Sequence, residues 1–555
     1  MDLRSASQSL WGYATAAGAG ISLVRLLRRH RTVTQLKRLP PYAPEVATAE
    51  VRLAVGQGRA LLPLLLAGSL CLGLGGCGSA PYGPAKPHKP SSMRTTEPLW
   101  RLAPSTSPTA TSTPSPSSTV IAPSHTPTPV QPAPPSSVSA LWPVYHQNSG
   151  RSGASNNTPV PGSLQRSWST ELDGAVYGEP LDIDGDVVVA TENDSLYALN
   201  PTTGSIIWRD HVGAPVTGGL PCGDILPLGI TGTPAFDPAT GTIFAVAEET
   251  GPEHVLYAFD AATGTVRWSR QVDIPIPSEV ASAVQQRPAL AVANGYVYVA
   301  FGGLDGDCAQ YRGAVAAVPT SGSGATLDYV VPTQREGAVW ATGGPVVGAG
   351  GRIYISTGNG AATSGAWDYT DSVLELSPTL TLLDSFAPAS WATDNAHDLD
   401  LGSVAPTLLP DGYLFIAGKG GRGYVLSQSH LGGVGGELAS GPTCGGQMAF
   451  GGTSFAGDTV YLPCQNGVQA IAVGAGSFSI GWQTSSGANG PPVLGGGCVF
   501  SVDTSTGVLY ALSQAAGAVV AQVAVGAVPH FTSPTVVGTQ LFVGTDTGVV
   551  GIAGA

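Results

Sequence analysis

The 555-residue chain has room for two or three ordinary domains, or for one large repeat domain with tails. Gly is abundant (76 residues) and only 11% of the residues are charged, a composition that favours short strands joined by tight turns over helices. The formal charge is −13, and from Ala140 onward thirty-three acidic residues stand against eleven Lys and Arg, so this acidic part excludes nucleic acid as a partner.

Residues 1–50 form a basic N-terminal extension that includes the segment RLLRRHR, from Arg25 to Arg31. The extension precedes an export signal, although such signals usually begin close to an N-terminus. Val51 or Val55 can correspond to an alternative start codon. We therefore expect one of two cases: the true start lies downstream, or these residues form a cytoplasmic or membrane-surface extension.

Residues 51–77 resemble a bacterial lipoprotein signal peptide. Arg52 and Arg59 precede an apolar run, residues 61–74, that is short for a membrane span. The run ends in LGGC, which resembles a lipobox: small residues permit cleavage before Cys77, whose thiol then receives a diacylglyceryl group. The alternative is a membrane anchor with an incidental Cys. The resemblance implies an exported lipoprotein, anchored to the outer face of the cytoplasmic membrane or in the cell envelope.

Residues 78–139 are rich in Pro, Ser and Thr, as in TSPTATSTPSPSSTVIAPSHTPTPVQPAPPSS. A segment with so few apolar side chains to bury is expected to be a disordered, polyproline-like stalk. At up to about 3.1 Å per residue it can hold the following domain far from a membrane.

Residues 140–555 carry one pattern eight times. Each copy has a short first strand with a small residue and usually Pro, such as TGTPAFD, then a second strand such as TIFAVAE and a third such as LYAFD, and period-two alternation supports the strands. The stretch LYALNPTTGSIIW (Leu196 to Trp208) recurs as LYAFDAATGTVRW (Leu256 to Trp268) and adds a Gly turn and a fourth strand. Units of roughly forty to sixty residues with four strands predict an all-β fold, an eight-bladed β-propeller of four-stranded antiparallel blades.

The eighth copy ends without a fourth strand. The segment QRSWSTEL around Trp168, at the front of the domain, resembles that strand without its three predecessors. We expect it to pair with the last blade, which closes the ring and removes a free sheet edge. Trp168, Trp208, Trp268 and Trp482 hold equivalent outer-strand positions and are expected to pack between neighbouring blades.

The motif A-x-D-x-x-T-G-x-x-x-W resembles the repeat of the pyrroloquinoline quinone (PQQ) propeller family over residues 140–555. The resemblance implies the propeller fold. It does not imply one activity, because this repeat builds both quinoprotein alcohol dehydrogenases and cofactor-free scaffolds such as the outer-membrane assembly lipoprotein.

Four segments resemble the cofactor site of the quinoprotein dehydrogenases, where PQQ stacks on a Trp and a metal, Ca²⁺ or a lanthanide, is held by Glu and Asn. The resemblance makes Trp340 in GAVWATGGP the stacking residue and Asn359 in IYISTGNG a metal ligand. It makes Asp398 or Asp400 in NAHDLDLGSV the catalytic base, with Asp400 as a further metal ligand, and it places Lys419 in AGKGGRGYVL against the quinone carbonyls. Such a set can remove a hydroxyl proton and polarise a quinone that accepts the hydride.

The chain also departs from this family pattern. Cys308 stands at the position of the metal-binding Glu, and the adjacent Asp307 would have to be re-aimed because strand neighbours face opposite ways. There is no vicinal Cys pair to lie over the quinone and no C-x-x-C-H haem motif to accept electrons.

Each of these site residues has a structural interpretation too. Trp340 then packs between blades, Asn359 forms a turn, Asp398 and Asp400 cap turns, and Lys419 is their ion-pair partner. A third interpretation is a funnel that binds another polar ligand through the same groups.

The exported part holds five further cysteines, and export favours disulfides. Cys444 precedes the first strand of the sixth repeat and Cys464 ends the second, positions that meet in an antiparallel pair, so Cys444–Cys464 is the first predicted bridge. Cys222–Cys308 is the second, across the funnel mouth, and Cys498 is predicted to be a buried free thiol. Zinc is a weak alternative, because no His has ligand spacing to these residues.

Three functions remain open. We favour a binding or assembly scaffold, because Cys308 replaces the metal-binding Glu and no electron acceptor is encoded; it needs no cofactor. The alternatives are a PQQ-dependent alcohol or aldose dehydrogenase with an altered metal site, and a cell-wall or polysaccharide-binding module. We expect a monomer that contacts the membrane through lipid on Cys77 and meets an envelope protein or a cell-wall component. His530, in VPHFTSP, either faces the channel or is a hydrogen-bonded turn residue.

Overall fold

The computed structural model describes residues 140–156, 158 and 161–554. The expectations for the N-terminal extension, the signal, the lipidated Cys77 and the linker lie outside these residues. In the described part of the chain, no helix is both long and apolar enough to span a bilayer.

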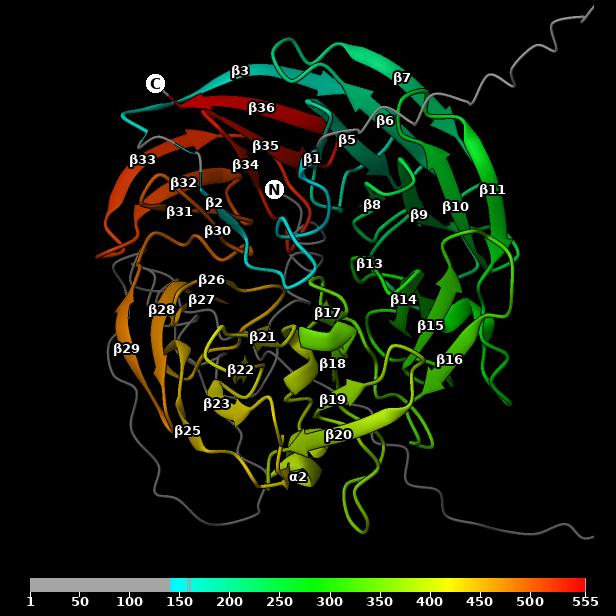
Figure 1. Cartoon of the computed structure of the whole chain (residues 1–555), viewed down its shortest axis with the longest axis vertical. Helices are drawn as coiled ribbons and strands as arrows, with labels where there is room; N and C mark the ends of the chain where they lie inside the picture. The colour runs from blue at the N-terminus through cyan, green and yellow to red at the C-terminus, as the bar shows by residue number, and fades with distance from the viewer. Residues whose placement is uncertain (1–139, 157, 159–160, 555) are drawn as a thin grey trace, which may run out of the picture. The chain divides into compact units, whose positions relative to one another are not determined.

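Eight small sheets stand in a ring around one axis, as Figure 1 shows. Each sheet contains four antiparallel strands, so the predicted all-β, eight-bladed propeller is confirmed. Four further short strands extend individual blades, namely β1 (Ala140–Trp142), β2 (Ala154–Ser155), β12 (Val284–Gln285) and β24 (Gly433–Val434).

The blades follow the eight sequence repeats in order. Blade 1 holds β4 (Leu181–Ile183), β5 (Asp186–Thr191), β6 (Ser195–Leu199) and β7 (Ile206–His211); blade 2 holds β8 (Ala235–Asp237), β9 (Thr242–Glu249), β10 (Glu253–Asp260) and β11 (Val266–Gln271); blade 3 holds β13 (Ala291–Ala293), β14 (Tyr296–Gly303), β15 (Ala314–Pro319) and β16 (Leu327–Val330); blade 4 holds β17 (Val346–Val347), β18 (Ile353–Thr357), β19 (Ser372–Leu376) and β20 (Leu382–Ala387). Blade 5 holds β21 (Thr407–Leu408), β22 (Tyr413–Ala417), β23 (Arg422–Ser427) and β25 (Ala439–Pro442); blade 6 holds β26 (Ser454–Ala456), β27 (Thr459–Cys464), β28 (Gly467–Gly474) and β29 (Ser477–Gln483); blade 7 holds β30 (Val493–Gly495), β31 (Cys498–Asp503), β32 (Val508–Ser513) and β33 (Val519–Ala524); blade 8 holds β34 (Thr535–Val537), β35 (Gln540–Thr545), β36 (Gly548–Gly554) and β3 (Leu164–Glu171). One short helix, α2 (Trp391–Ala396), and four 3-10 turns (Ala281–Ala283, Ala349–Gly351, Leu401–Ser403 and Cys444–Gly446) complete the described elements.

Inner and outer strands differ in burial. Every residue of β6 is buried, whereas the side chains of β7 are exposed or half-buried. The expected period-two alternation is therefore wrong for the inner strands. Each blade packs between two neighbours, so an inner strand is covered on both faces and needs apolar residues at nearly every position.

The ring closes as predicted. Strand β3 pairs antiparallel with β36, and Trp168 lies opposite Gly551. Figure 1 shows β3 as the outermost strand of the last blade, so the front and the end of the domain share one sheet. This pairing gives β36 a partner at its outer edge, which an open ring would leave exposed.

The repeated Trp and Gly pack against each other across blade boundaries. Trp168, Trp208, Trp268 and Trp482 lie on Gly204, Gly264, Gly322 and Gly517 of the next blade, and a Cβ atom at any of these glycines would lie 2.6–2.7 Å from Cδ2 of the Trp ring. The Trp168 indole also donates a hydrogen bond to the Pro201 carbonyl at 2.8 Å. The predicted inter-blade role of the tryptophans is confirmed, and the flat ring explains why the turn requires Gly.

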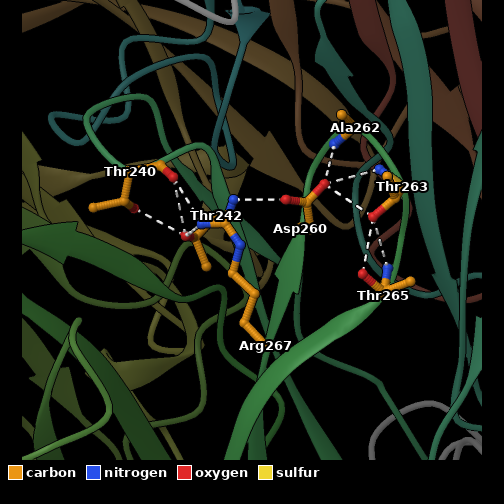
Figure 2. A network of polar contacts seen from close by, with 7 residues as sticks. All are labelled: Thr240, Thr242, Asp260, Ala262, Thr263, Thr265 and Arg267. Atoms are coloured by element: carbon orange, nitrogen blue, oxygen red, sulfur yellow. Dashed lines mark hydrogen bonds and ion pairs between the residues drawn. The ribbon is translucent and has the colours of Figure 1, made fainter. Parts of the chain in front are cut away.

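The Asp and Thr of the motif shape the same turn, as Figure 2 shows for blade 2. Asp260 accepts hydrogen bonds from the backbone N–H groups of Ala262 and Thr263 at 3.1 and 3.0 Å. Its other oxygen accepts from Arg267 at 2.7 Å. These bonds hold the turn open for the incoming Trp208 ring at Gly264.

A central hub, defined as residues 143–153, was not predicted. The hub runs from β1, paired with β4 of blade 1, to β2, paired with β30 of blade 7, and Figure 1 shows this segment at the middle of the ring. The carbonyls of Ser149, Ser152 and Gly153 accept backbone hydrogen bonds from blades 4, 6 and 7, at 2.8, 2.9 and 2.7 Å. The hub therefore ties blades together from inside the ring.

Two buried side chains anchor the hub. Arg151 is 4% exposed and donates to the carbonyls of Tyr145, Leu290 and Pro345 at 2.9–3.1 Å. His146 is fully buried between the Thr453 carbonyl and the Ser533 hydroxyl, and burial lowers its pKa to about 3. The hub therefore fills the axis with polar groups, nearly all of which have hydrogen-bond partners.

Both predicted disulfides are present. Cys444 and Cys464, the latter at the end of β27, form a buried bridge with a Cα–Cα distance of 5.4 Å. Cys498, the first residue of β31, is a buried free thiol, as predicted. The second bridge belongs to the candidate site.

Candidate functional site

Loops at one end of blades 4 and 5 bring the predicted site residues together. Trp340 precedes β17, Asn359 follows β18, Asp398 and Asp400 lie between α2 and the turn at Leu401–Ser403, and Lys419 joins β22 to β23. Lys419 Nζ lies 2.7 Å from Asp398 Oδ1 and 2.7 Å from Asp400 Oδ2. The same ammonium lies 5.4 Å from the centre of the Trp340 ring, a cation–π distance.

Asp400 is the most constrained member of this group. Its side chain is 4% exposed, against 64% for Asp398. Asp400 Oδ1 accepts the backbone N–H of Asn359, while Oδ2 holds Lys419. The pKa of Lys419 is lowered by burial, but Asp400 and Asp398 outweigh that effect and raise it above its ordinary value. Lys419 therefore stays charged and keeps both carboxylates in place.

The Asn359 side chain is less constrained. Its backbone contacts Asp400 and Gly337, but the carboxamide makes no hydrogen bond to the described residues. A buried amide, Asn395 on α2, supports the neighbouring backbone by accepting the N–H of Gly360 at 2.8 Å and donating to Thr370. The Asn359 carboxamide is thus free to contact a ligand.

Cys308 is joined to Cys222, with an S–S distance of 2.03 Å and a Cα–Cα distance of 6.1 Å. The bridge links the loop after β7 to the loop after β14, which confirms the predicted staple. The adjacent Asp307 has a left-handed backbone (φ 45°), and its carboxylate accepts the hydroxyl of Tyr311. The Cys308 sulfur is therefore not free to bind a metal as the expected Glu would, and one Asp307 oxygen is engaged by Tyr311.

Sequence reasoning missed an aromatic trio, defined as Trp340, Phe450 and Phe531. The Trp340 ring lies 6.3 Å from each Phe ring, and the two Phe rings stack at 5.5 Å. The three residues precede the first strands of blades 4, 6 and 8. The available signal was an aromatic residue just ahead of the fourth, sixth and eighth repeats, and the fold brings these three positions together.

A second missed residue is Asp371, which is fully buried behind Asp400. Its Oδ1 accepts the N–H of Leu401 at 3.0 Å, and its Oδ2 has no hydrogen-bond partner. Burial raises the pKa of Asp371 well above its ordinary value, and Asp400 adds to the rise. Nothing in its sequence context distinguishes it from a turn residue.

A pocket opens at the axis beside the trio. Its lining comes from Tyr145, Tyr177, Glu179, Thr231, Thr233, Arg287, Thr342, His530, Phe531 and Ser533. His530 faces the channel, as one of its two interpretations predicted. The cavity volume is about 10 Å³, room for about one water molecule.

Comparisons with known proteins agree with this architecture. The family model of the outer membrane protein assembly factor BamB matches residues 144–395. Polyvinylalcohol dehydrogenase of Sphingopyxis sp. (strain 113P3) is 26% identical over 318 residues, 48% of this chain, and the chain spans about half (45%) of that relative's length. The quinohemoprotein alcohol dehydrogenase of Comamonas testosteroni has a similar fold, with a TM-score of 0.57 at 16% identity over 74% of this chain and 80% of that one. A europium-containing methanol dehydrogenase gives 0.53 at 16% identity over 73% and 89% of the two chains.

The chain carries a PQQ-like β-propeller.

The residues of this PQQ-like propeller do not fit the metal that the resemblance implies. The cysteine at the expected Glu position is bound to Cys222, and both oxygens of Asp400 are engaged by protein groups. Within the described residues, no group of three or more His, Cys, Asp or Glu side chains is arranged to hold a metal ion. Asn359 and Asp400 lie side by side, as predicted. The positive group next to Asp400 is the Lys419 ammonium, where the resemblance implies a metal ion.

The axial pocket also does not fit a quinone cofactor. Its enclosed space is about the size of one water molecule, so a fused-ring quinone cannot enter it in this conformation. The side chains of Tyr145 from the hub and Phe531 from the trio form part of the pocket wall. In the described conformation, the PQQ-like propeller has a filled axis and a polar cluster at one side of it.

Proposed function

We propose that the propeller is a binding or assembly scaffold presented outside the cytoplasm, rather than a dehydrogenase. The observation that carries the proposal is the Cys222–Cys308 disulfide, because it removes a metal-ligand position from the candidate site and converts it into a covalent staple. The Lys419 ion pairs support the same conclusion, since they satisfy both carboxylates without a metal.

The filled axis agrees with a scaffold role. A scaffold needs a rigid ring with stable loops, and the hub supplies cross-links between blades through Arg151 and His146. The family model for an outer membrane assembly factor gives the proposal a precedent in the same fold.

The anchoring is also a proposal. We propose that lipid on Cys77 holds the protein at the outer face of the cytoplasmic membrane or in the cell envelope. Two disulfides among the described residues suit an oxidising compartment outside the cytoplasm. Wild-type protein should fractionate with membranes, and Cys77→Ser should release it; membrane retention of the variant contradicts the anchor.

The test of the scaffold proposal is a cofactor titration of the purified full-length chain. PQQ with Ca²⁺, and separately with La³⁺, should give no bound-quinone absorbance and no dye reduction with a panel of alcohols and aldoses. Saturable quinone binding that Asn359→Ala or Asp400→Ala abolishes would overturn the proposal. The double variant Cys222→Ser/Cys308→Glu, which restores the missing carboxylate, is the informative companion: metal binding gained there identifies the disulfide as the cause.

A PQQ-dependent dehydrogenase with an altered metal site is the second candidate. The observation that favours it is the convergence of Trp340, Asn359, Asp400 and Lys419 at one loop cluster, as the resemblance implies. The partial match to polyvinylalcohol dehydrogenase agrees with it. The same titration decides between the two.

A further inference from the structure

The axial pocket contains a guanidinium group that makes no ion pair with the described residues, although the charges of Asp224 and Asp305 act on it from a greater distance. Arg287 lies between β12 and β13, in the lead-in to blade 3. Its guanidinium lies 4.9 Å from the centre of the Phe531 ring, and one of its nitrogens contacts His530 Nε2. Among the described residues, no carboxylate lies within ion-pair distance of Arg287. Most of its N–H groups are therefore without a protein acceptor.

His530 orients Arg287 without neutralising it. Burial lowers the pKa of His530 to about 3, with a smaller contribution from the Arg287 charge, so the imidazole is neutral at physiological pH. Its other nitrogen lies 3.6 Å from Asp224, and its ring packs edge-on against Tyr177 at 5.6 Å. A neutral ring that accepts from Arg287 leaves the positive charge available to a ligand.

A second free donor lines the same pocket. The Tyr177 hydroxyl makes no hydrogen bond to the described residues, and burial raises the pKa of Tyr177, so the hydroxyl keeps its proton. The pocket hydroxyls of Thr233 and Ser533, by contrast, are already bonded to Glu179 N–H and to His146. The Thr233 hydroxyl uses only its acceptor side there, so the strongest unused donors in the pocket are a cation and a phenol.

The acidic residue in this pocket does not oppose an anion. Glu179 accepts from the Trp142 indole at 2.9 Å and from the His146 N–H at 2.8 Å. Burial raises its pKa to about 8, so the group is mostly uncharged at neutral pH. An anion beside Arg287 therefore meets little repulsion from Glu179.

We propose that Arg287 and Tyr177 form a binding site for a carboxylate carried on a ring, such as a uronic acid. The planar guanidinium fork matches a planar carboxylate, and the cavity, with room for about one water-sized group, favours a carboxylate oxygen over a bulkier phosphate. The body of the ligand then lies outside the cavity against the aromatic trio, whose ring faces suit the apolar face of a sugar or an aromatic ring. This site goes beyond the scaffold role, which does not require it. It shares the Trp340 ring with the Lys419 cluster but uses neither of its carboxylates nor its ammonium group.

The test is isothermal titration calorimetry of the full-length chain with glucuronate, benzoate, glucose and inorganic phosphate. Saturable binding of glucuronate or benzoate, with weaker binding of glucose and phosphate, is expected. Arg287→Gln should weaken carboxylate binding at least about tenfold, because charged hydrogen bonds are lost, and Tyr177→Phe by roughly threefold to tenfold. Arg270→Gln, at a half-buried arginine on β11 that bonds a loop carbonyl, should leave binding unchanged.

Several outcomes would overturn the site. Absence of carboxylate binding at millimolar concentration, equal binding of glucose, tighter binding of phosphate, or full binding by Arg287→Gln would each do so. If Arg287→Gln fails to fold, Arg287→Lys and Tyr177→Phe carry the test: the lysine keeps the charge but loses the fork and should bind more weakly than wild type. Since the scaffold proposal is tested with PQQ and metal, failure of one does not imply failure of the other.

Discussion

The ammonium of Lys419 lies 2.7 Å from Asp400 Oδ2, inside a polar cluster where the family pattern leads one to expect a metal ion. An ammonium group supplies one positive charge and directional hydrogen bonds, whereas a metal supplies at least two charges and open coordination positions. This pair therefore satisfies Asp400 without a metal, and it makes the loops of blades 4 and 5 depend on each other.

Removal of this cation should destabilise the propeller. In Lys419→Met, Asp400 stays buried without its partner, and loss of one member of a buried pair costs about 3–5 kcal/mol. Urea unfolding of the full-length chain measures the change. Lys419→Met/Asp400→Asn should recover part of the loss, because the orphaned charge is gone; equal stability of wild type and Lys419→Met would contradict a buried pair.

The Trp–Gly contact gives a prediction with a matched control. Gly264 and Gly295 both have left-handed backbones, with φ of 74° and 78°. A Cβ at Gly264 would overlap the Trp208 ring, but a Cβ at Gly295 meets nothing within 4 Å. Gly295→Ala should cost about 1–2 kcal/mol of strain alone, and Gly264→Ala about 2 kcal/mol more from overpacking. Equal unfolding midpoints for the two variants would contradict the claim that the Trp ring is what requires Gly at this turn.

Buried acids should make stability depend on pH. Burial raises the pKa of Glu192 from 4.5 to about 8, so between these values the folded protein holds a proton that the unfolded chain has released. Stability should therefore fall as the pH rises through this window. Glu192→Gln, which resembles the protonated acid, should flatten the slope by up to about 1.4 kcal/mol per pH unit.

The measurement is the free energy of unfolding at several pH values between 5 and 8. Glu179, whose pKa is also raised to about 8, keeps some slope in the variant. Glu171→Gln, at an exposed position at the end of β3, serves as the control and should leave the slope unaltered. An unchanged slope in Glu192→Gln would show that this acid is ionised in the folded protein.

The hub should protect the front of the domain from proteases. Arg151→Met removes three hydrogen bonds to buried carbonyls, those of Tyr145, Leu290 and Pro345, at a cost of about 3 kcal/mol or more. Limited proteolysis followed by mass spectrometry should then show faster cleavage near residues 143–153 than in wild type. Cleavage at the wild-type rate would mean that the hub is held mainly by β1 and β2.

The repeats made the fold and its closure predictable from the sequence. A recurring strand pattern with a Gly turn is local information, and the lone Trp168 strand could be matched to the copy that lacked one. The disulfides followed as well, because the antiparallel blade pattern places Cys444 and Cys464 side by side. Cys222, ahead of blade 2, and Cys308, within blade 3, were expected to meet across the funnel mouth.

The tertiary structure alone decided what fills the axis. Residues 143–153 have no repeat and no periodicity, so nothing local shows that Arg151 would reach the Pro345 carbonyl, 194 residues away at the start of blade 4. The aromatic trio and the Arg287–His530 contact likewise join lead-in loops of separate blades. The sequence determined the ring because each blade is specified by its own strands; the contents of the ring depend on side chains from many blades that meet only after it has closed.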